Sequence, residues 1–294
     1  MVESTQAVSV GSLVKRFRWR VILTTSLVFL EAAVGLLFPL FIGFAVNDLI
    51  EDSYRGVFAL AGLGLGALVV GSGRRFYDTR VYARIYETVT VEMVQRERAR
   101  GANVSRITAR SQLMTEFVEF LENSMPELIG TVISIVGTLG ILVGINLGVF
   151  LASLGLLVVV VVIYWVTAGR NLRYNAGYND ELEAQVEAIS SKDRETVGAH
   201  YSRLMRWNIR LSDLETSNYA AFFVGVIALL FYAPIALVTN GVEAGFVVAA
   251  LMYVFQYVEG LMVMPLHIQQ AIRLKEISSR LGSSDEPEEV PPTG

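Results

Sequence analysis

The sequence contains no cysteine and only two histidines, which limits the chemistry that it can support. Without cysteine there are no disulfides, thiolate metal sites or cysteine nucleophiles. Two histidines leave almost no room for a histidine-built metal site. Charge is also scarce, since 18% of the 294 residues are charged and 53% are hydrophobic, whereas about a quarter of an ordinary soluble domain is charged. This balance excludes a soluble enzyme, a disordered protein and a nucleic-acid binder.

Signatures of nucleotide binding and catalysis are absent as well. A phosphate loop requires Gly-x4-Gly-Lys-Ser/Thr, and none of the lysines, Lys15, Lys192 and Lys275, is followed by Ser or Thr. The glycine-rich run at 62–66 lies inside an apolar segment, which favours close helix packing over a nucleotide fingerprint. No nucleophile, base and orienting group share a helix face. We therefore expect no ATPase, no enzyme activity and no cofactor.

Long apolar runs dominate what is present. A hydrocarbon core about 30 Å thick is crossed by roughly 20 apolar residues. Six such runs occur, at approximately residues 20–46, 57–73, 128–146, 147–168, 219–239 and 246–266. Residues 1–19 have no cleavable signal pattern, and their basic and aromatic end predicts an interfacial elbow before the first run. The sequence predicts an all-α membrane protein with six transmembrane helices.

The basic residues predict the orientation of these helices. Of the 24 lysines and arginines, all but Arg55 lie before the first run, between the second and third, between the fourth and fifth, or after the sixth. The positive-inside rule therefore predicts that both termini are cytoplasmic. We expect a multi-pass protein of the bacterial plasma (inner) membrane.

Two inner segments, 74–127 and 169–218, are each about fifty residues long. They are rich in residues that favour helix, and structureless loops of that length are uncommon in compact domains. We interpret them as cytoplasmic extensions of the membrane helices, about 75 Å long for fifty helical residues. The resulting domain spans 20–281, and the acidic tail 282–294 is expected to be disordered.

This arrangement of three hairpins with short outer turns and two long inner extensions resembles the six-helix membrane domain of ABC exporters of type IV. The likeness covers about 11–281 and includes the stretches 38–50 and 74–80. The resemblance implies a domain-swapped homodimer, with coupling helices near 102–110 and 190–201. An exporter of this family continues into an ATPase domain, which this sequence is expected to lack.

Carboxylates inside apolar runs are unusual, because each costs about 2.5–3.5 kcal/mol near the bilayer centre. Glu31 lies near the middle of the first run and Glu259 near the middle of the sixth, which predicts similar depths. We interpret both as proton-accepting groups, with His267 as a candidate proton relay. The alternative is that each glutamate only fixes the register of neighbouring helices and that His267 is an interfacial residue without such a role.

Polar residues at helical spacing predict a substrate cavity. Gln256 and Glu259 share a face of the sixth run with His267, and Tyr253 and Tyr257 could stack on a substrate or simply pack. A second polar face leads into the third run, provided that Pro126 does not displace the helical register. With flanking Glu119, it comprises Glu116, Asn123, Glu127, Thr131, Ser134 and Thr138. The acidic members could instead be hydrated at the inner mouth.

Two regions are expected to lie away from the substrate. The valine-rich stretch 156–163 has no polar face and predicts contacts with lipid or dry helix surfaces. His200 and Trp207 belong to an inner extension, where we expect a solvated or partner-contacting face.

The leading hypothesis is an ATPase-less secondary transporter for a peptide-like or amphipathic small molecule, coupled to protons through membrane glutamates. It is similar to SbmA/BacA-like peptide transporters, which keep an exporter-like membrane domain, lack an ATPase and carry glutamates along their cavity. One alternative is the membrane subunit of an ABC exporter energised by a separately encoded ATPase. Another is a membrane scaffold or regulator that transports nothing.

Overall fold

The computed structural model describes residues 16–191 and 193–282, and within these ranges every element is helical. Six helices are long and apolar enough to cross a membrane, which confirms the predicted all-helical, six-span architecture. Most of the predicted elbow and nearly all of the predicted tail, residues 1–15 and 283–294, lie outside the described residues, as does Lys192.

The chain divides into two compact units. Of the described residues, one unit contains 16–141 and 243–282, and the other contains 142–191 and 193–242. We describe each unit by itself.

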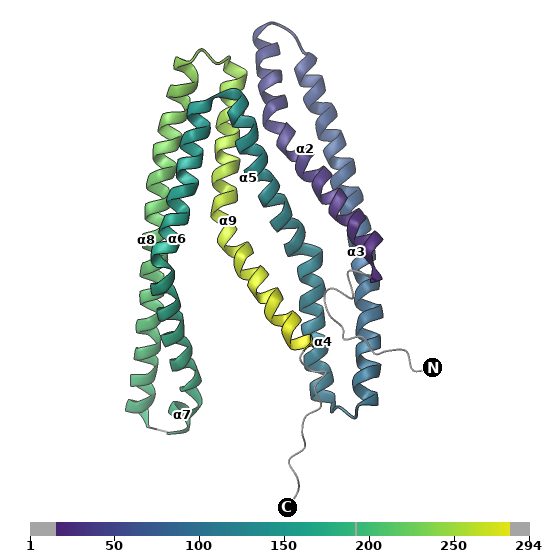
Figure 1. The fold of residues 1–294 in the computed structure, drawn as a ribbon, viewed down its shortest axis with the longest axis vertical. Coiled ribbons are helices and arrows are strands. Elements are labelled where there is room, and N and C mark those ends of the chain that lie inside the picture. The colour runs from purple at the N-terminus through teal and green to yellow at the C-terminus, as the bar shows by residue number, and fades with distance from the viewer. Residues whose placement is uncertain (1–15, 192, 283–294) are drawn as a thin grey trace, which may run out of the picture. The chain divides into compact units, whose positions relative to one another are not determined.

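The first unit begins with a hairpin of α2 (Arg18–Ile50) and α3 (Arg55–Ala99), which are coloured purple to blue in Figure 1. The predicted outer loop is a four-residue turn. Helix α3 begins close to the backbone of α2, because a Cβ added at Gly56 would lie 2.7 Å from the Cα of Ala45. Helix α3 then continues without a break from its apolar segment through its polar half and ends at Ala99.

The next segment runs through α4 (Val104–Glu119), the π-helix η1 (Phe120–Ser124) and α5 (Met125–Ile145). The π-turn comes directly before Pro126. Proline has no N–H, and its ring clashes with the carbonyl four residues earlier in a regular α-helix. A π-turn relieves this clash but shifts the helical face by one residue. The condition attached to the predicted polar face therefore fails for its first residues: Glu116 and Glu119, which precede η1, do not share a face with Glu127.

An apolar core binds the polar half of α3 to α4 and to α9 (Ala244–Gly282). It consists of Val81, Tyr82, Ile85, Val89, Met114, Phe117, Val118 and Ile277. Buried large side chains of this kind each contribute about 1.5–3 kcal/mol. The polar halves of these helices are thus packed together, not solvated on all sides.

Helix α9 also packs closely on α2. The backbone N–H of Gly245 donates to the side-chain oxygen of Asn47 at 2.6 Å, and a Cβ on Gly245 would lie 2.0 Å from the carbonyl oxygen of Gly43. Further along, the hydroxyl of Tyr253 donates to the carbonyl of Leu36. Figure 1 shows α9 changing direction along its length, consistent with an internal proline, Pro265.

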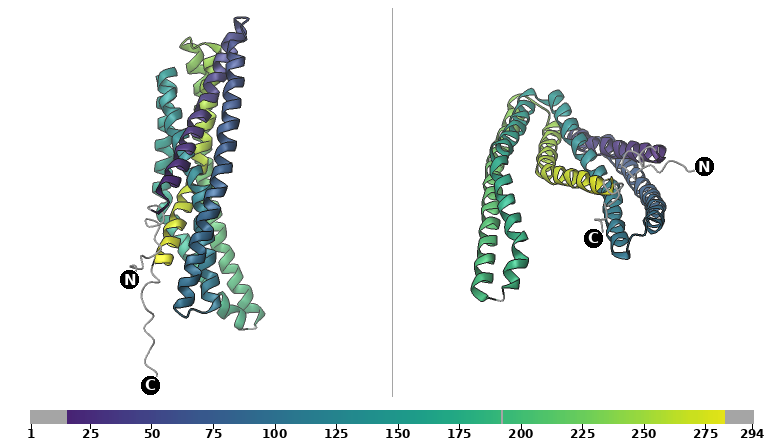
Figure 2. Two further views of the ribbon diagram at one scale, coloured as in Figure 1. Left: turned by 90° about the vertical axis from the view of Figure 1, so that its right-hand side faces the viewer. Right: turned by 60° about the horizontal axis from the view of Figure 1, so that its bottom comes forward.

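The second unit is a long hairpin of α6 (Leu147–Glu183) and α8 (Arg194–Thr239), joined through the short α7 (Gln185–Ser190). The two long helices run side by side in every view of Figures 1 and 2. Asn146 separates α5 from α6 and caps α6 by accepting a hydrogen bond from the N–H of Val149 at 3.1 Å. The predicted break near 146 is therefore a single residue.

Candidate functional site

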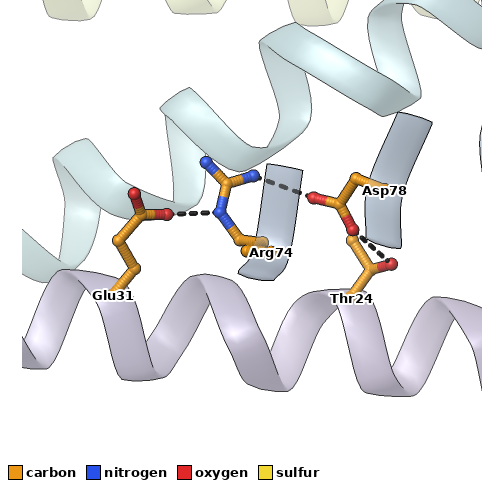
Figure 3. Close-up of polar contacts among 4 residues, drawn as sticks. All are labelled: Thr24, Glu31, Arg74 and Asp78. Carbon is orange, nitrogen blue, oxygen red and sulfur yellow. Dashed lines mark hydrogen bonds and ion pairs between the residues drawn. The ribbon is translucent and has the colours of Figure 1, made fainter. Parts of the chain in front are cut away.

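A chain of polar contacts links α2 and α3 in the first unit (Figure 3). Arg74 donates through Nε to the carboxylate of Glu31 and through Nη1 to Asp78 at 2.9 Å. The other oxygen of Asp78 accepts from the hydroxyl of Thr24 at 2.9 Å. Asp78 is 3% exposed, so its charge depends on these partners. One guanidinium is therefore held by two carboxylates from different helices.

Glu31 pairs with a residue at the end of the apolar segment of α3. Its partner Arg74 is the first charged residue after the apolar segment of α3, so Glu31 is level with the end of that segment, not with its middle. The distance along α2 from Glu31 to Ile50 at the turn is roughly 28 Å for 19 helical residues, close to the thickness of a hydrocarbon core. The depth of Glu31 in a bilayer stays a prediction.

A cavity of about 490 Å³ opens beside these contacts, between α2, α3 and the junction of η1 with α5. Four carboxylates and two guanidiniums line it, so acidic groups outnumber basic ones. The charged lining residues are Glu31, Arg74, Arg75, Asp78, Glu122 and Glu127. Of the predicted site residues, this cavity brings together Glu31 and Glu127. Sequence reasoning did not assign Arg74 or Asp78 to a site, although their i, i+4 spacing at the end of an apolar run was a usable signal.

A second cavity, of about 360 Å³, lies between α4, η1 and α9. Glu116 and Glu119 line it, and Glu116 accepts two hydrogen bonds from the guanidinium of Arg273, at 2.7 and 3.1 Å. Asn123 lines both cavities. The predicted polar face is thus divided, with Glu116 and Glu119 on one cavity and Glu127 on the other.

The remaining polar residues of α5 meet α9 at a packed seam. His267 is 4% exposed, with Nε2 3.1 Å from the hydroxyl of Thr131 and Nδ1 3.3 Å from the side-chain oxygen of Gln270. Thr138 is fully buried, and its hydroxyl has no hydrogen-bond partner among the described residues. Ser134 is half-buried. None of Thr131, Ser134, Thr138 and His267 lines either of the two cavities.

The other predicted residues of α9 point in different directions. Tyr253 and Tyr257 are fully buried and line neither cavity, and the side-chain oxygen of Gln256 is buried without a partner. Glu259 is exposed, and the described residues offer it no hydrogen bond or ion pair. The antiparallel register set by Tyr253 and Leu36 nevertheless places Glu259 level with Glu31.

The second unit has its buried charges far from its apolar segment. His200 is fully buried, and its Nδ1 lies 3.0 Å from the carboxylate of Glu181, which also accepts a hydrogen bond from Arg203 at 2.8 Å. The expectation of a solvated face is therefore wrong for His200, because its ring packs between α6 and α8. A cavity of about 290 Å³ in the apolar part of this hairpin has no charged residue in its lining, which includes Leu156 and Tyr232.

Nothing in the described ranges resembles a metal site, since no three His, Asp or Glu residues are placed to hold an ion. The site is instead a pair of cavities lined in part by charged residues, among helices of membrane-spanning length, and these features define a multi-pass membrane protein.

Comparison with protein families agrees with this class. The family described as the ABC transporter transmembrane region matches residues 11–246. The chain therefore belongs to the transmembrane-region family of ABC transporters, and these 294 residues contain no ATPase domain. The search among curated proteins finds no match.

Proposed function

We propose that this chain is the membrane-spanning half of a homodimeric transporter whose acidic cavity admits a peptide-like or amphipathic molecule that carries positive charge. The observation that supports this most strongly is the 490 Å³ cavity, in which four carboxylates face two guanidiniums. A cation gains from such a lining because the field of several like charges is focused in a cleft with low-dielectric walls.

We propose that Glu31 couples this cavity to protons. Protonation of Glu31 removes the charge that pairs with Arg74 and leaves the guanidinium to Asp78 alone. Because Glu31 is on α2 and both other groups are on α3, this change weakens a polar link between the two helices. A proton crossing 100 mV supplies about 2.3 kcal/mol, which suffices for a roughly fiftyfold gradient of substrate.

Glu259 is the second proposed carboxylate. A charged group on a membrane-length helix is costly unless it faces water or a polar partner. Glu259 is exposed, has no partner within the described ranges and is level with Glu31. These features fit a group that faces the translocation path. His267 is the proposed relay, because its Nε2 lies 3.1 Å from the hydroxyl of Thr131 and its Nδ1 lies 3.3 Å from the side-chain oxygen of Gln270.

The test is flux of a fluorescent cationic peptide into vesicles that contain the purified protein. We expect uptake to require an imposed pH gradient, to stop when a protonophore collapses it, and to be indifferent to ATP. The double variant Glu31→Gln and Glu259→Gln should lose about tenfold or more of the gradient-driven flux. Glu87→Gln, an exposed carboxylate on the polar half of α3, serves as the matched control.

Two results would contradict proton coupling. Undiminished gradient-driven flux in the folded double variant would remove the two glutamates from the mechanism. Absence of flux for every cationic peptide tried, with the protein folded and inserted, would favour a scaffold or regulator.

A second candidate is the membrane subunit of a transporter that is energised by a separately encoded ATPase. Membership of the ABC transporter transmembrane-region family favours it, because such domains commonly pair with ATPases. Stoichiometric recovery of an ATPase subunit from native membranes, together with uptake that requires ATP and survives the protonophore, would establish this candidate in place of the first.

We also propose that both termini face the cytoplasm of a bacterial inner membrane. The distribution of lysine and arginine supports this orientation. The natural absence of cysteine makes the test clean, since single cysteines can be introduced at Asp52 and Gly101. An impermeant thiol reagent added to intact cells should label the first position and spare the second.

A further inference from the structure

The hairpin of α2 and α3 has two sides, and one of them borders the 490 Å³ cavity. The two helices meet along a line marked by the contacts of Arg74 with Glu31 and of Thr24 with Asp78. The residues that follow this line by one position and border the cavity are Ala32, Arg75 and Thr79. Residues that precede the line by one position lie on the opposite side of both helices, because in an antiparallel pair the same shift along each chain turns both faces to one side.

We call this opposite side the basic face. On α2 it consists of Arg20, Leu23, Leu27 and Leu30, and on α3 of Gly73, Tyr77, Arg80 and Arg84. A Cβ added at Gly73 would meet nothing within 4 Å, so no described residue covers the face at this point. On both helices the face is apolar toward the α2–α3 turn and basic away from it.

The arginines of the basic face lie about one bilayer thickness from the turn. Arg20 is 30 residues from Ile50, and Arg80 is 25 residues from Arg55. These helical lengths are about 45 and 38 Å, and a bilayer including its head groups is about 40–45 Å thick. A hairpin with its turn at one membrane surface therefore brings these arginines among the head groups of the opposite leaflet, with the leucines beneath them.

None of these arginines has a carboxylate partner among the described residues. Arg80 donates to the carbonyl of Phe76 at 2.8 Å, and its guanidinium lies over the ring of that residue. The guanidinium of Arg20 lies 5.8 Å from the ring centroid of Phe17. Arg84 is exposed and has no ion pair within the described ranges. Their positive charges are therefore not neutralised within this part of the chain.

The surroundings hold this charge at a fixed level. Phe17, under the guanidinium of Arg20, packs against the apolar core of α3, α4 and α9. Trp19 is 71% exposed beside it, and tryptophan is enriched at membrane–water interfaces. Glu87, one turn from Arg84, is exposed and unpaired among the described residues, but one carboxylate leaves an excess of positive charge over three arginines.

We infer that the basic face binds one anionic phospholipid of the leaflet opposite the α2–α3 turn, with its phosphate at the three arginines and an acyl chain along the leucines. Such a lipid matches both bands, because it places negative charge at head-group depth and hydrocarbon directly beneath. A free phosphate ion would match the basic band alone. The inference goes beyond the proposed function and depends on neither transport nor its energy source.

The test is quenching of Trp19 by brominated lipids in nanodiscs that contain the full-length protein. Trp165→Phe and Trp207→Phe leave Trp19 as the only tryptophan. Brominated phosphatidylglycerol or brominated phosphatidylcholine is added in increasing share to an unbrominated phosphatidylcholine bilayer. We expect half-maximal quenching at an about tenfold lower share of phosphatidylglycerol than of phosphatidylcholine.

The variant Arg20→Gln, Arg80→Gln and Arg84→Gln should lose this preference. Lysine at the same three positions should retain most of it, because an ammonium also attracts a phosphate. Thermal unfolding in lipid-free detergent shows whether each variant is folded. The preference should also survive an excess of inorganic phosphate at constant ionic strength.

A matched control removes three exposed arginines outside the basic face, with Arg98→Gln, Arg194→Gln and Arg206→Gln. It should keep the preference for phosphatidylglycerol. Loss of the preference in this control as well would show only diffuse attraction between the lipid and a basic protein, which contradicts a site.

Four further outcomes would overturn the inference. These are equal quenching by the two lipids in the parent chain, a preference that persists in the folded glutamine variant, a preference that inorganic phosphate abolishes, and no quenching by either lipid. The last result would show that another chain covers the face. Peptide flux is measured separately, so a lipid preference without flux would count against the proposed transport and leave this inference standing.

Discussion

The hairpins α2–α3 and α6–α8 are built from helices of similar kind but bury their charges in different places. In α2–α3, the contacts of Glu31, Arg74 and Asp78 lie at the edge of the apolar segment and beside a charged cavity. In α6–α8, the cavity in the apolar segment has no charged residue in its lining, and the buried pair of His200 with Glu181 lies at the other end of the hairpin, near α7. The comparison teaches that two hairpins of similar length and apolarity can bury their charged groups at different levels, so the position of the charges does not follow from the apolar pattern alone.

The largest expected effect follows from removing Arg74. Arg74→Ala leaves Asp78 buried with only the hydroxyl of Thr24 and leaves Glu31 without its cation. Breaking a buried ion pair by removing one partner costs about 3–5 kcal/mol, and the partial exposure of Glu31 favours the lower end. Equilibrium unfolding in mixed micelles should show a loss of about 3 kcal/mol.

The neighbouring variant Arg75→Ala is the control, since Arg75 lines the same cavity but is exposed, and it should change stability by less than about 0.5 kcal/mol. Equal losses in the two variants would show that Arg74 contributes no more than a surface arginine.

The second-largest effect is expected from tightening helix packing, and it differs between the two units. Gly245→Ala brings a Cβ against the backbone of α2, whereas Gly225→Ala in α8 meets only the end of the Leu156 side chain, at 2.7 Å. A backbone cannot yield as a side chain can, so we expect a loss of about 2–3 kcal/mol for Gly245→Ala and under about 1 kcal/mol for Gly225→Ala. Thermal unfolding of both variants in one detergent measures the difference, which a reversed order would contradict.

A smaller effect is expected from the buried histidine of the second unit. His200→Ala leaves Glu181 paired with Arg203 and creates a small void between α6 and α8. We expect a loss of about 1–2 kcal/mol, confined to this hairpin. Amide hydrogen exchange should be faster for the ends of α6 and α8 next to α7, whereas the protection of amides in α2 and α3 should be unchanged. Increased exchange in α2 and α3 would show that the two hairpins are not energetically separate.

The helical architecture was predictable from the sequence because it depends on signals that are local. Apolar runs of membrane length, polar segments rich in helix-favouring residues and capping residues such as Asn146 act within one helix. Each predicted span lies within a helix of the structure, except that the third span ends one residue late, at Asn146, and the polar segments continue those helices. The side of the membrane on which they project stays a prediction.

The site was predicted less well because it depends on how helices face one another. Helical spacing alone could not show that a π-helical turn, η1, precedes Pro126. This turn shifts the helical register, so Glu116 and Glu127 line different cavities. It could not pair Glu31 with Arg74, which is 43 residues away. Nor could it predict the burial of His200, because the imidazole ring contacts the carboxylate of Glu181 on another helix.

The smallest expected effect concerns the start of α8 and depends on pH. The side chain of Asp193 accepts hydrogen bonds from the hydroxyl of Thr196 and from the N–H groups of Thr196 and Glu195, which lower the pKa of this carboxyl below its ordinary value of 3.8. A carboxyl whose pKa is lowered in the folded state stabilises that state above its unfolded pKa, and the stabilisation is lost as pH falls through the folded pKa. Protection of the first-turn amides of α8, corrected for intrinsic exchange, should therefore be constant near neutral pH and fall below about pH 4. In Asp193→Ala the protection should be low throughout, because the cap is missing at every pH. Glu195→Gln, which keeps the cap, is the control, and a wild-type profile without this acid-dependent loss would show that the ionised carboxylate does not stabilise the helix start.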